Sequence, residues 1–517
     1  MRISCRLITA VLLMATSSLA FAQSAVPLGS PKYLPTPEES IGWRGDGTGR
    51  YPGATPPTIW SRKRSVAGYE TKGILWATPL PEQSAASPIV VGKSIFVTSE
   101  NTDLVCLDKS TGRILWIRSN PEFEGLSDEE RKADPGYEKL ALLLPQLAKA
   151  NADTVEELNA QQAAAATAGP HAPGPALANK RKLERQIWDQ QLAIYKKDGY
   201  HRYGSQGVFG YAAQTPVSDG TRVCAYYSTG ISVCYDLDGK RAWIHQKQGG
   251  GPEHGNFCSP ILWGNRLVVW GQDVRAYDVD TGKLAWTGHA DNAYGSLLRL
   301  QSGNDLVVGT ALGRFFRLRD GQPIWGDAGF GSGIPTPIVE GNVVVAHSDQ
   351  NNRGTRTFKL PPSTDGGKLQ LVATLKAGWT EEELREKDFQ RGLVASPLFV
   401  DGLIYNLTEG GGLLVNNATT GELMYRKVLP MKSKTAYWDW AGASASPTLA
   451  GKYIYLMDNQ GTTVVIEPGP TYKQVAVNLL EESKDGKNQS QNLTTPVFDG
   501  TRMYYRTPGY LYCIGEK

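Results

Sequence analysis

The sequence predicts an all-β fold, an eight-bladed β-propeller of four-stranded antiparallel blades with a helical insertion between blades 1 and 2. One strand–turn–strand unit recurs along the 517 residues, and a Ser-Pro or Thr-Pro marker stands upstream of each copy. Most consecutive markers lie 37 to 60 residues apart, which suits four short strands and their turns. Because the unit repeats in register, we expect one repeat architecture, not a string of separate domains.

The repeated unit is clearest at residues 104–116, LVCLDKSTGRILW. Its apolar start favours a strand, Asp108 and Gly112 favour a tight turn, and a second strand ends on Trp116. An Asp side chain can accept backbone N–H groups of its own turn, and Gly tolerates positive φ. Further copies begin at Val233 and Ala276, and weaker copies begin at Leu318 and Val415.

Each marker is a hydroxyl residue followed by Pro and an apolar β-run. Pro at the first residue of a strand costs no ladder hydrogen bond, which explains its fixed place. The marker at position 296 lacks the Pro and is a degenerate copy. The eight markers begin at Ser87, Thr215, Ser259, Ser296, Thr336, Ser396, Ser446 and Thr495.

The chain divides into three parts. Residues 1–22 have the charged start, short apolar run and small-residue end of a cleaved signal peptide. Residues 23–73 are rich in Pro, Gly and polar residues, and we expect them to wrap the outside as an extended arm. Residues 74–517 form the propeller. The last repeat has three strands, so the spare strand around Trp76 is predicted to complete the last blade and leave no open edge.

The 128-residue gap between the first two markers holds an insertion at about 121–205. Its composition shifts to Ala, Leu, Glu, Gln and Lys, which are good helix formers. Helices are predicted near 136–150, 154–167 and 179–198, with a Gly- and Pro-rich break at 168–175. Pro145 is expected to kink the first helix. We expect these helices to cap the channel on the face of the loops between blades.

Charge and chain composition exclude several classes of partner. The formal net charge of +3 falls to +1 without Arg2 and Arg6, which gives no electrostatic case for nucleic acid or an anionic membrane. The apolar run near the start is too short to span a bilayer, so no transmembrane segment is expected in the mature chain.

Five cysteines remain after Cys5 leaves with the signal peptide, and an odd number rules out a fully paired disulfide framework. Cys106, Cys234 and Cys513 occupy the same place in three copies of the repeat and are interpreted as small buried side chains between sheets. Cys224 and Cys234 flank a turn and can face each other across a hairpin. A disulfide between these two stays open as an alternative.

The marker strand, the Asp-x-x-Thr-Gly turn and the closing Trp together resemble the pyrroloquinoline quinone (PQQ)-like propeller repeat, from about Ile74 to Gly515 apart from the insertion. That superfamily includes quinoprotein alcohol dehydrogenases and BamB-like outer-membrane assembly proteins, which have no cofactor. The segment 43–49, WRGDGTG, is also similar to the start of secreted BamB-like propellers. The resemblance implies a periplasmic or secreted protein.

The sequence departs from both branches of this superfamily. Methanol-type quinoproteins carry a vicinal Cys pair over the quinone, whereas no two cysteines are adjacent here. Their Ca²⁺-binding acidic set is not recognisable either, so no cofactor is expected and PQQ is kept as an alternative. BamB is anchored through a lipidated Cys after its signal, whereas Gln23 follows Ala22 here. A soluble monomer is therefore expected.

Candidate ligand-binding residues lie in the loops that precede the marker strands, because such loops gather around one mouth of a propeller channel. An exposed Trp-Asp-Trp is unusual, since two indoles bury nothing unless something covers them. The alternative is that they pack beneath the helical insertion. No catalytic or metal-ligating residue is assigned, and His347 with Asp349 is a minor candidate. The candidates are Glu253, His254, Tyr294, Arg391, Trp438, Asp439 and Trp440.

Two functions of different classes are compatible with these features. The favoured one is a non-catalytic, extracytoplasmic binding or assembly scaffold of the BamB-like kind, which takes a protein or a polar ligand at the loop face. The alternative is a PQQ-dependent dehydrogenase or another oxidoreductase that uses the propeller channel. Quinone titration separates them, because a scaffold binds no chromophore and reduces no dye with alcohols or sugars.

Overall fold

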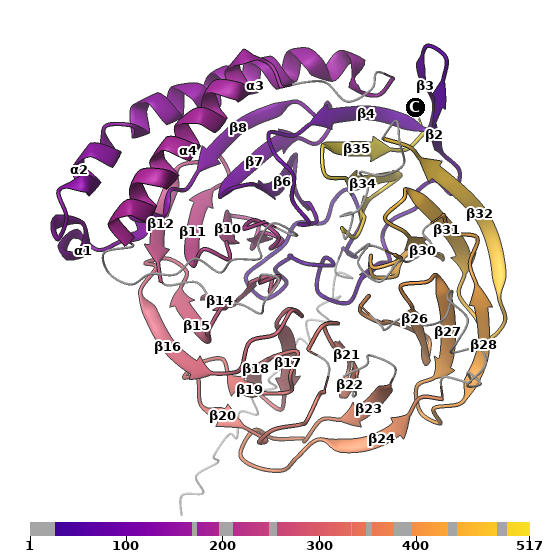
Figure 1. Cartoon of the computed structure of the whole chain (residues 1–517). Helices are drawn as coiled ribbons and strands as arrows, with labels where there is room; N and C mark the ends of the chain where they lie inside the picture. Colours follow the sequence, from indigo (N-terminus) through magenta and orange to yellow (C-terminus); the bar gives the residue numbers. More distant parts are fainter. Residues whose placement is uncertain are drawn as a thin grey trace, which may run out of the picture.

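The computed structural model describes residues 26–167, 173–195, 210–247, 256–331, 333–347, 354–376, 394–432, 442–482 and 494–516. Eight antiparallel sheets stand radially around a central axis (Figure 1). In each blade the first strand lies nearest the axis and the fourth lies on the rim. The predicted eight-bladed propeller of four-stranded blades is confirmed.

Blades 1 to 4 follow one another along the chain. Blade 1 contains β5 (Ile89–Val91), β6 (Ser94–Ser99), β7 (Asp103–Asp108) and β8 (Ile114–Ser119). Blade 2 contains β9 (Val217–Ser218), β10 (Arg222–Tyr226), β11 (Ile231–Asp236) and β12 (Arg241–Gln246). Blade 3 contains β13 (Ile261–Trp263), β14 (Arg266–Trp270), β15 (Asp273–Asp278) and β16 (Leu284–His289). Blade 4 contains β17 (Leu298–Ser302), β18 (Asp305–Gly309), β19 (Phe315–Arg317) and β20 (Pro323–Ile324).

Blades 5 to 8 complete the ring. Blade 5 contains β21 (Ile338–Glu340), β22 (Val343–His347), β23 (Thr355–Lys359) and β24 (Gln370–Thr374). Blade 6 contains β25 (Leu398–Val400), β26 (Leu403–Leu407), β27 (Gly412–Asn417) and β28 (Leu423–Val428). Blade 7 contains β29 (Thr448–Ala450), β30 (Tyr453–Met457), β31 (Thr462–Glu467) and β32 (Lys473–Leu480). Blade 8 contains β33 (Val497–Asp499), β34 (Arg502–Arg506), β35 (Tyr510–Ile514) and β4 (Ile74–Pro79).

Strand β4 closes the ring, because it comes from the N-terminal side and pairs with the last strand of the chain. It runs antiparallel to β35, with Trp76 opposite Cys513 and Thr78 opposite Leu511. Blade 8 thereby gains its fourth strand, and the open edge of β35 disappears. The prediction that Trp76 completes the last blade is confirmed.

The turns between third and fourth strands form as their sequence predicts. In blade 1, Asp108 Oδ1 accepts the backbone N–H groups of Ser110 at 3.0 Å and Thr111 at 2.8 Å. Gly112 then adopts a φ of 72°, a conformation that strains other residues. This turn chemistry sets the register of the hairpin and places the following Trp on the rim side of the blade.

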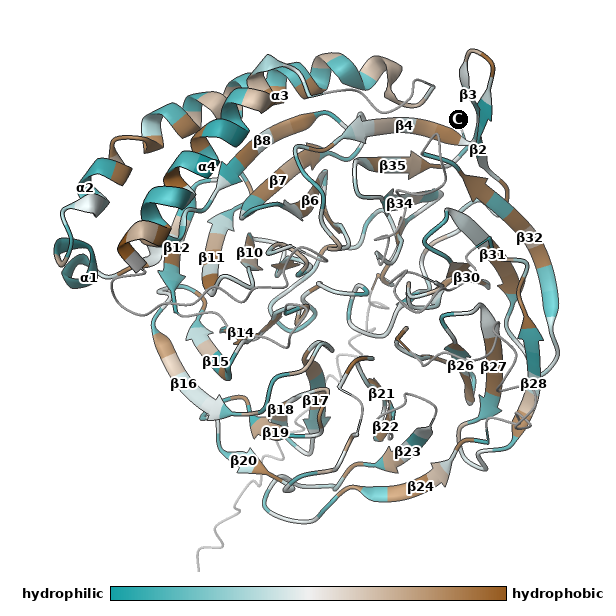
Figure 2. Cartoon of the chain, viewed as in Figure 1, coloured by the Kyte–Doolittle hydropathy of each residue, from teal (hydrophilic) through white to brown (hydrophobic). Residues whose placement is uncertain are grey.

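The glycine turns of blades 1 to 4 each receive a Trp from the preceding blade. The fourth-strand indole lies flat enough on the turn that a side chain on the glycine would collide with it. An added Cβ would stand 2.5 Å from Trp76 at Gly112, 2.8 Å from Trp116 at Gly239, 2.7 Å from Trp243 at Gly282 and 2.6 Å from Trp286 at Gly321. These contacts join neighbouring blades. Apolar residues of the strands, brown in Figure 2, form the core between the sheets.

The insertion contains η1 (Glu122–Gly125), α1 (Asp128–Lys132), α2 (Gly136–Ala141), α3 (Leu144–Ala165) and α4 (Pro175–Tyr195). Helix α3 runs continuously across the boundary predicted between 136–150 and 154–167, so that boundary is wrong. Pro145 lies in the first turn of α3, where backbone N–H groups make no hydrogen bond within the helix. A proline there breaks no helical hydrogen bond, so the predicted kink is wrong.

The helices lie on the rim of the propeller and not over the channel, so the expected cap is wrong for the described part of the insertion. Helix α3 packs against β8 and β4, and α4 packs against α3 (Figure 1). Asn159 of α3 accepts the N–H of Ile114 at 2.8 Å and donates to its oxygen at 2.9 Å. The insertion therefore supplies hydrogen-bond partners to β8 and covers its outer edge. This cover prevents another strand from pairing with β8.

The N-terminal arm crosses the base of the propeller, the face that carries the turns between first and second strands. The expectation that it wraps the outside is therefore incomplete. Its strands are β1 (Arg50–Tyr51), β2 (Ser61–Ser65) and β3 (Gly68–Lys72), and β1 and β2 flank blade 7 on its two edges. Backbone bonds tie the arm to blades 3, 7 and 8: Gly264 N–H to Pro37 O (2.8 Å), Gly451 N–H to Tyr51 O (3.0 Å) and Gly500 N–H to Gly29 O (2.6 Å).

Candidate functional site

Most of the predicted ligand-binding residues lie outside the described residues. Of the seven, only Tyr294 is described; Glu253, His254, Arg391 and the Trp438–Trp440 segment are not. Tyr294 is half-buried on the connection between β16 and β17, and its ring centroid lies 6.1 Å from that of Phe257. The gathering of these residues at one channel mouth stays a prediction.

The hydroxyl residues of the markers form a chain of hydrogen bonds around the channel axis. The backbone N–H of one marker residue donates to the side-chain oxygen of the marker in the next blade. Seven links have this geometry: Ser87 to Thr215 (3.2 Å), Thr215 to Ser259 (3.0 Å), Ser259 to Ser296 (3.0 Å), Ser296 to Thr336 (2.7 Å), Thr336 to Ser396 (2.9 Å), Ser396 to Ser446 (3.0 Å) and Thr495 to Ser87 (2.9 Å).

These seven links, here named the marker ring, give the marker hydroxyl a structural role. All eight marker residues are buried, where an unpaired N–H is costly, so each link also meets the need of a buried donor. Ser296 lacks the following Pro and still takes part. The hydroxyl is therefore the feature that the eight markers share, and it connects neighbouring blades, including blades 8 and 1 from the two ends of the chain.

The segment Trp43–Gly49, here named the plug loop, lies in the base of the channel. Its Arg44 is 1% exposed and donates from Nη1 to Pro397 O at 2.9 Å and from Nη2 to Pro447 O at 2.7 Å. Burial lowers the pKa of the Arg44 guanidinium to about 10. A Cβ on Gly49 would stand 2.3 Å from this guanidinium, which explains the glycine there. The chain thus fills one end of its own channel.

A cavity of about 80 Å³ remains between the plug loop and the inner strands of blades 3 to 5. It has room for a few water molecules. Arg299 and Trp43 line it, together with marker residues of these blades. The Arg299 guanidinium is held by Ser40 O at 2.8 Å and Asp46 O at 2.5 Å, so its main contacts hold the arm in place.

A carboxyl and a guanidinium side chain are buried on the upper face, the face opposite the base. Glu100 Oε1 accepts the backbone N–H groups of Tyr211 at 2.7 Å and Ala212 at 2.8 Å. Burial raises the pKa of Glu100 to about 8, although these two donors and Arg506 lower it. Arg506 is fully buried and donates to Glu82 O at 3.3 Å. Glu100 therefore fixes the chain where it returns from the insertion into blade 2.

A buried ion pair attaches α4 to blade 1. Lys180 Nζ lies 2.6 Å from Asp103 Oδ2 and also contacts Glu184, and the Lys180 and Asp103 side chains are fully buried. Burial disfavours the ammonium charge, but the two carboxylates raise the pKa of Lys180 above its ordinary value. Burial also raises the pKa of Glu184. Removal of one partner from such a pair leaves an uncompensated buried charge.

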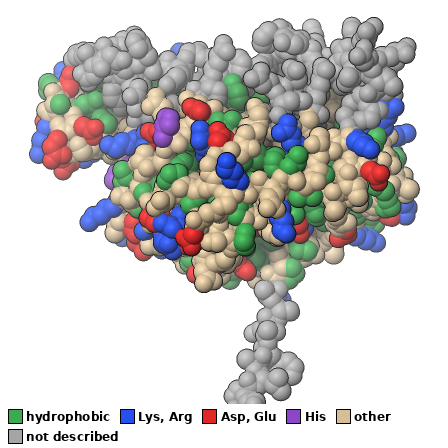
Figure 3. Space-filling model, turned by 90° about the horizontal axis from the view of Figure 1, so that it is seen from below, with side chains coloured by type: hydrophobic (Ala, Val, Ile, Leu, Met, Phe, Trp, Pro, Cys, Tyr) green, Lys and Arg blue, Asp and Glu red, His purple; other side chains and the backbone are tan. Residues whose placement is uncertain are grey.

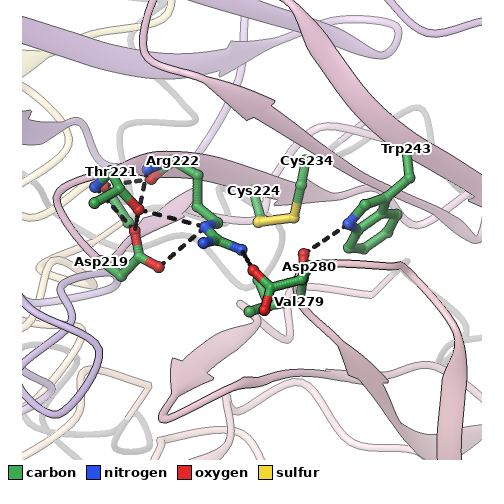
Figure 4. Close-up of a disulfide and its surroundings, with 9 residues drawn as sticks. Asp219, Thr221, Arg222, Cys224, Cys234, Trp243, Val279 and Asp280 are labelled. Atoms are coloured by element: carbon green, nitrogen blue, oxygen red, sulfur yellow. Dashed lines mark hydrogen bonds and ion pairs between the residues drawn. A yellow bond between two sulfur atoms is a disulfide. The ribbon is translucent and has the colours of Figure 1, made fainter.

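Cys224 and Cys234 form a disulfide, the alternative that the sequence leaves open. They lie opposite each other on β10 and β11 (Figure 4), buried in the core between blades 2 and 3. Nearby, Trp243 Nε1 donates to Val279 O of blade 3 at 2.8 Å. The disulfide thus joins two strands of blade 2 beside its contact with blade 3.

The described cysteines do not fit the vicinal pair of a PQQ site. The disulfide joins residues ten positions apart and is enclosed by the blade core. The three unpaired cysteines among the described residues are buried at Cys106, Cys258 and Cys513. Cys513 and Cys106 stand opposite Trp76 and Trp116 in the sheets, as small side chains beside large ones.

The minor candidate His347 is 3% exposed, and its Nδ1 lies 2.9 Å from Thr355 Oγ1. Its suggested partner Asp349 is outside the described residues. Within the described ranges, no three His, Cys, Asp or Glu side chains are grouped closely enough to hold a metal ion. No helix in the described part of the chain has the length and apolar character needed to cross a membrane.

Sequence reasoning missed three structural features, two at the channel and one on the rim. The marker hydroxyl could have been found, because Ser or Thr stands at all eight marker positions. The contacts of Arg44 had no local signal, since its acceptors are carbonyl groups more than 350 residues away. Lys180 had no local signal either, since its partner Asp103 lies on β7 of blade 1, before the insertion.

The family model described as outer membrane protein assembly factor BamB matches residues 49–140 and 270–517. The unmatched residues between these segments hold most of the insertion and blade 2. No curated protein matches the chain.

Several solved structures share a similar arrangement. BamB from Moraxella catarrhalis aligns with a TM-score of 0.43 and 16% identity, over 58% of this chain and 81% of that one. A quinohemoprotein alcohol dehydrogenase from Comamonas testosteroni aligns with a TM-score of 0.47 and 12% identity, over 86% and 77%. A europium-containing methanol dehydrogenase aligns with a TM-score of 0.47 and 11% identity, over 86% and 93%. Likeness at this level carries no functional argument.

Proposed function

The chain belongs to the family of outer membrane protein assembly factor BamB, and we propose that it is a non-catalytic binding or assembly scaffold of the cell envelope. The single observation that carries the proposal is the plug loop. Arg44 binds Pro397 O and Pro447 O, so the chain itself occupies the base of the channel. The buried marker hydroxyls likewise hold neighbouring blades together.

Recognition in this proposal takes place on the upper face, where variable loops stand on a rigid ring. The partner is a protein or a polar ligand, and the candidate contact residues are Glu253, His254, Tyr294, Arg391 and the Trp438–Trp440 segment. The protein acts outside the cytoplasm as a monomer, after cleavage between Ala22 and Gln23. Mass spectrometry of the mature protein is expected to show Gln23 as the first residue, whereas a retained Met1 contradicts the export step.

The test of the scaffold is capture from an envelope fraction with the tagged mature protein, followed by mass spectrometry. The double variant Trp438→Ala and Trp440→Ala is expected to lose the captured partner while its β-type circular dichroism stays intact. Trp43→Ala is the matched control, because it removes an indole from the base instead of the upper face. Equal retention by both variants places the site elsewhere.

The oxidoreductase alternative is tested separately by titration with PQQ and Ca²⁺. We expect no bound chromophore and no dye reduction with alcohols or sugars. Stoichiometric quinone binding with substrate-dependent dye reduction overturns the scaffold proposal. The enclosed position of the Cys224–Cys234 disulfide supports the expected result, because these sulfurs do not line an open site.

A further inference from the structure

Strand β32, the fourth strand of blade 7, leaves most of its outer edge open. The arm strand β2 pairs with it in parallel, but only through Ser61 opposite Leu479 and Arg62 opposite Leu480. Because β32 begins at Lys473, its first six residues have no strand beside them on the outer side in the described chain.

The protein covers comparable edges elsewhere on the rim. Helix α3 packs against the outer strands β8 and β4, and η1 packs against β12. Natural proteins protect open strand edges, because a row of unpaired N–H and C=O groups invites another strand. In the described chain the outer strands β16, β20, β24 and β28 have no strand on their outer side either, so β32 is distinguished by an edge that already holds one added strand.

The direction of the main-chain groups on β32 can be deduced from two hydrogen bonds. Leu480 N–H donates inward to Gly461 O at 2.9 Å, whereas Glu481 N–H donates outward to Arg62 O at 2.8 Å. Main-chain groups of successive residues in a strand point to opposite sides. The N–H and C=O of Val477 therefore point outward, in line with the position that β2 occupies.

Apolar side chains accompany these open groups. Val475 and Val477 are 37% and 45% exposed, and Ile59, in the arm segment that bonds to Asn478, is 57% exposed. Figure 3 faces the rim at β20 and β24, where hydrophobic side chains also stand between charged ones. An open edge with exposed apolar side chains is the pattern that receives an extended peptide as an added strand.

The other end of the open edge is basic. The Lys427 ammonium of β28 lies 5.5 Å from the centroid of the Tyr472 ring, just before β32 begins, and both Lys427 and Lys473 are exposed. A strand that runs parallel to β32, as β2 does, would place its N-terminal end beside these lysines. An acidic residue at that end complements the charge of Lys427, since Lys473 Nζ already lies 2.6 Å from Glu467 Oε2.

We propose that an extended segment of a partner protein adds to β32 as a further parallel strand, end to end with β2. The segment carries an acidic residue first and apolar side chains at alternate positions after it. The inference rests on the proposed scaffold function and names a second contact surface for it, on the rim and separate from the upper face.

The probe is fluorescein-labelled Glu-Val-Thr-Val-Thr-Val amide, added to the full mature protein and followed by anisotropy. Saturable binding is expected. Val477→Pro removes the outward N–H and leaves the bonds to β31, because Pro is tolerated on an edge strand where its nitrogen faces solvent. This variant is expected to bind the probe at least about tenfold more weakly, a loss that one or two backbone hydrogen bonds explain.

Val428→Pro is the matched control, since it alters the outer strand of the neighbouring blade and is expected to bind like the wild type. A peptide with N-methyl groups on its three Val residues is expected not to bind, because strand pairing needs those N–H groups. If Val477→Pro folds poorly, hydrogen exchange on the wild type is decisive: the probe must protect the amides of residues 474–478. No binding to the wild type, or equal binding to Val477→Pro, overturns the inference.

Envelope capture separates this inference from the proposed function. Capture of a partner that Val477→Pro retains as well as the wild type contradicts strand addition and leaves the scaffold standing. Absence of any captured partner contradicts the scaffold, whatever the peptide does.

Discussion

The indole of Trp76 lies so close to Gly112 that a Cβ on residue 112 would stand 2.5 Å from the ring. Gly112 also has a φ of 72°, so two independent causes require glycine at this turn. Gly341 isolates the backbone cause, because its φ is 55° and no atom lies within 4 Å of an added Cβ.

We predict that Gly112→Ala destabilises the protein more than Gly341→Ala. Both substitutions bear the cost of a left-handed backbone, about 1–2 kcal/mol. Gly112→Ala adds overpacking against a rigid ring, typically about 1–3 kcal/mol. Urea unfolding of the two variants measures the difference, and equal losses would show that the contact with Trp76 contributes nothing.

Sequence reasoning predicted the ring well because its signals are local and repeated. The turn at Asp108 to Gly112, the Pro after seven of the eight markers and the closing Trp are all consequences of backbone geometry within a few residues. Even the closure by Trp76 followed from counting strands, and the pairing with Cys513 confirms it.

The errors concern features that depend on tertiary contacts. Helix α3 continues past residue 150 because it packs along β8 and β4, and no local breaker in the sequence opposes that packing. The insertion is held on the rim by the ion pair between its buried Lys180 and Asp103 of β7. The spacing of these residues in the sequence does not predict this contact. Most candidate site residues lie outside the described residues, so only the half-buried position of Tyr294 can be compared with expectation.

The second prediction concerns the pH dependence contributed by Glu100. Its folded-state pKa, raised by burial to about 8, exceeds its ordinary value of 4.5. The protonated carboxyl therefore stabilises the fold fully below pH 4.5, and this stabilisation is lost as the pH rises to 8. Between these values the expected loss is roughly 1.4 kcal/mol for each pH unit.

Glu100→Gln is expected to flatten this dependence, because the amide stays neutral and its oxygen can still accept from Tyr211 and Ala212. The measurement is the free energy of unfolding at pH 6 and pH 9 for the variant and the wild type. Some dependence should persist, since burial also raises the pKa of Glu184. Glu129→Gln, on exposed α1, is the control. A profile in Glu100→Gln that is as steep as that of the wild type, or steeper, contradicts the assignment.

The third prediction concerns the ion pair between the insertion and blade 1. Lys180→Met leaves the buried carboxylate of Asp103 without its cation, and such losses typically cost about 3–5 kcal/mol. Hydrogen exchange is expected to accelerate in α4, which loses its anchor. Lys182→Met, an exposed position on the same helix, should leave both quantities unchanged. Equal exchange in the two variants would mean that apolar contacts alone hold α4.

The last prediction concerns the plug loop. Arg44→Met keeps a long side chain but removes the donors to Pro397 O and Pro447 O, and each buried oxygen left without a partner costs about 1–3 kcal/mol. The matched control is Arg50→Met, which breaks the partly exposed ion pair with Glu340, a type of contact worth about 0–1 kcal/mol.

We expect limited proteolysis to cut the arm of Arg44→Met faster than that of Arg50→Met or the wild type, within residues 26–60. The propeller itself should melt at nearly the wild-type temperature, because β4 and the marker ring close it without the plug loop. If Arg44→Met is cut no faster than Arg50→Met, the guanidinium does not hold the arm. If the whole propeller unfolds instead, Arg44 supports the ring and not only its base.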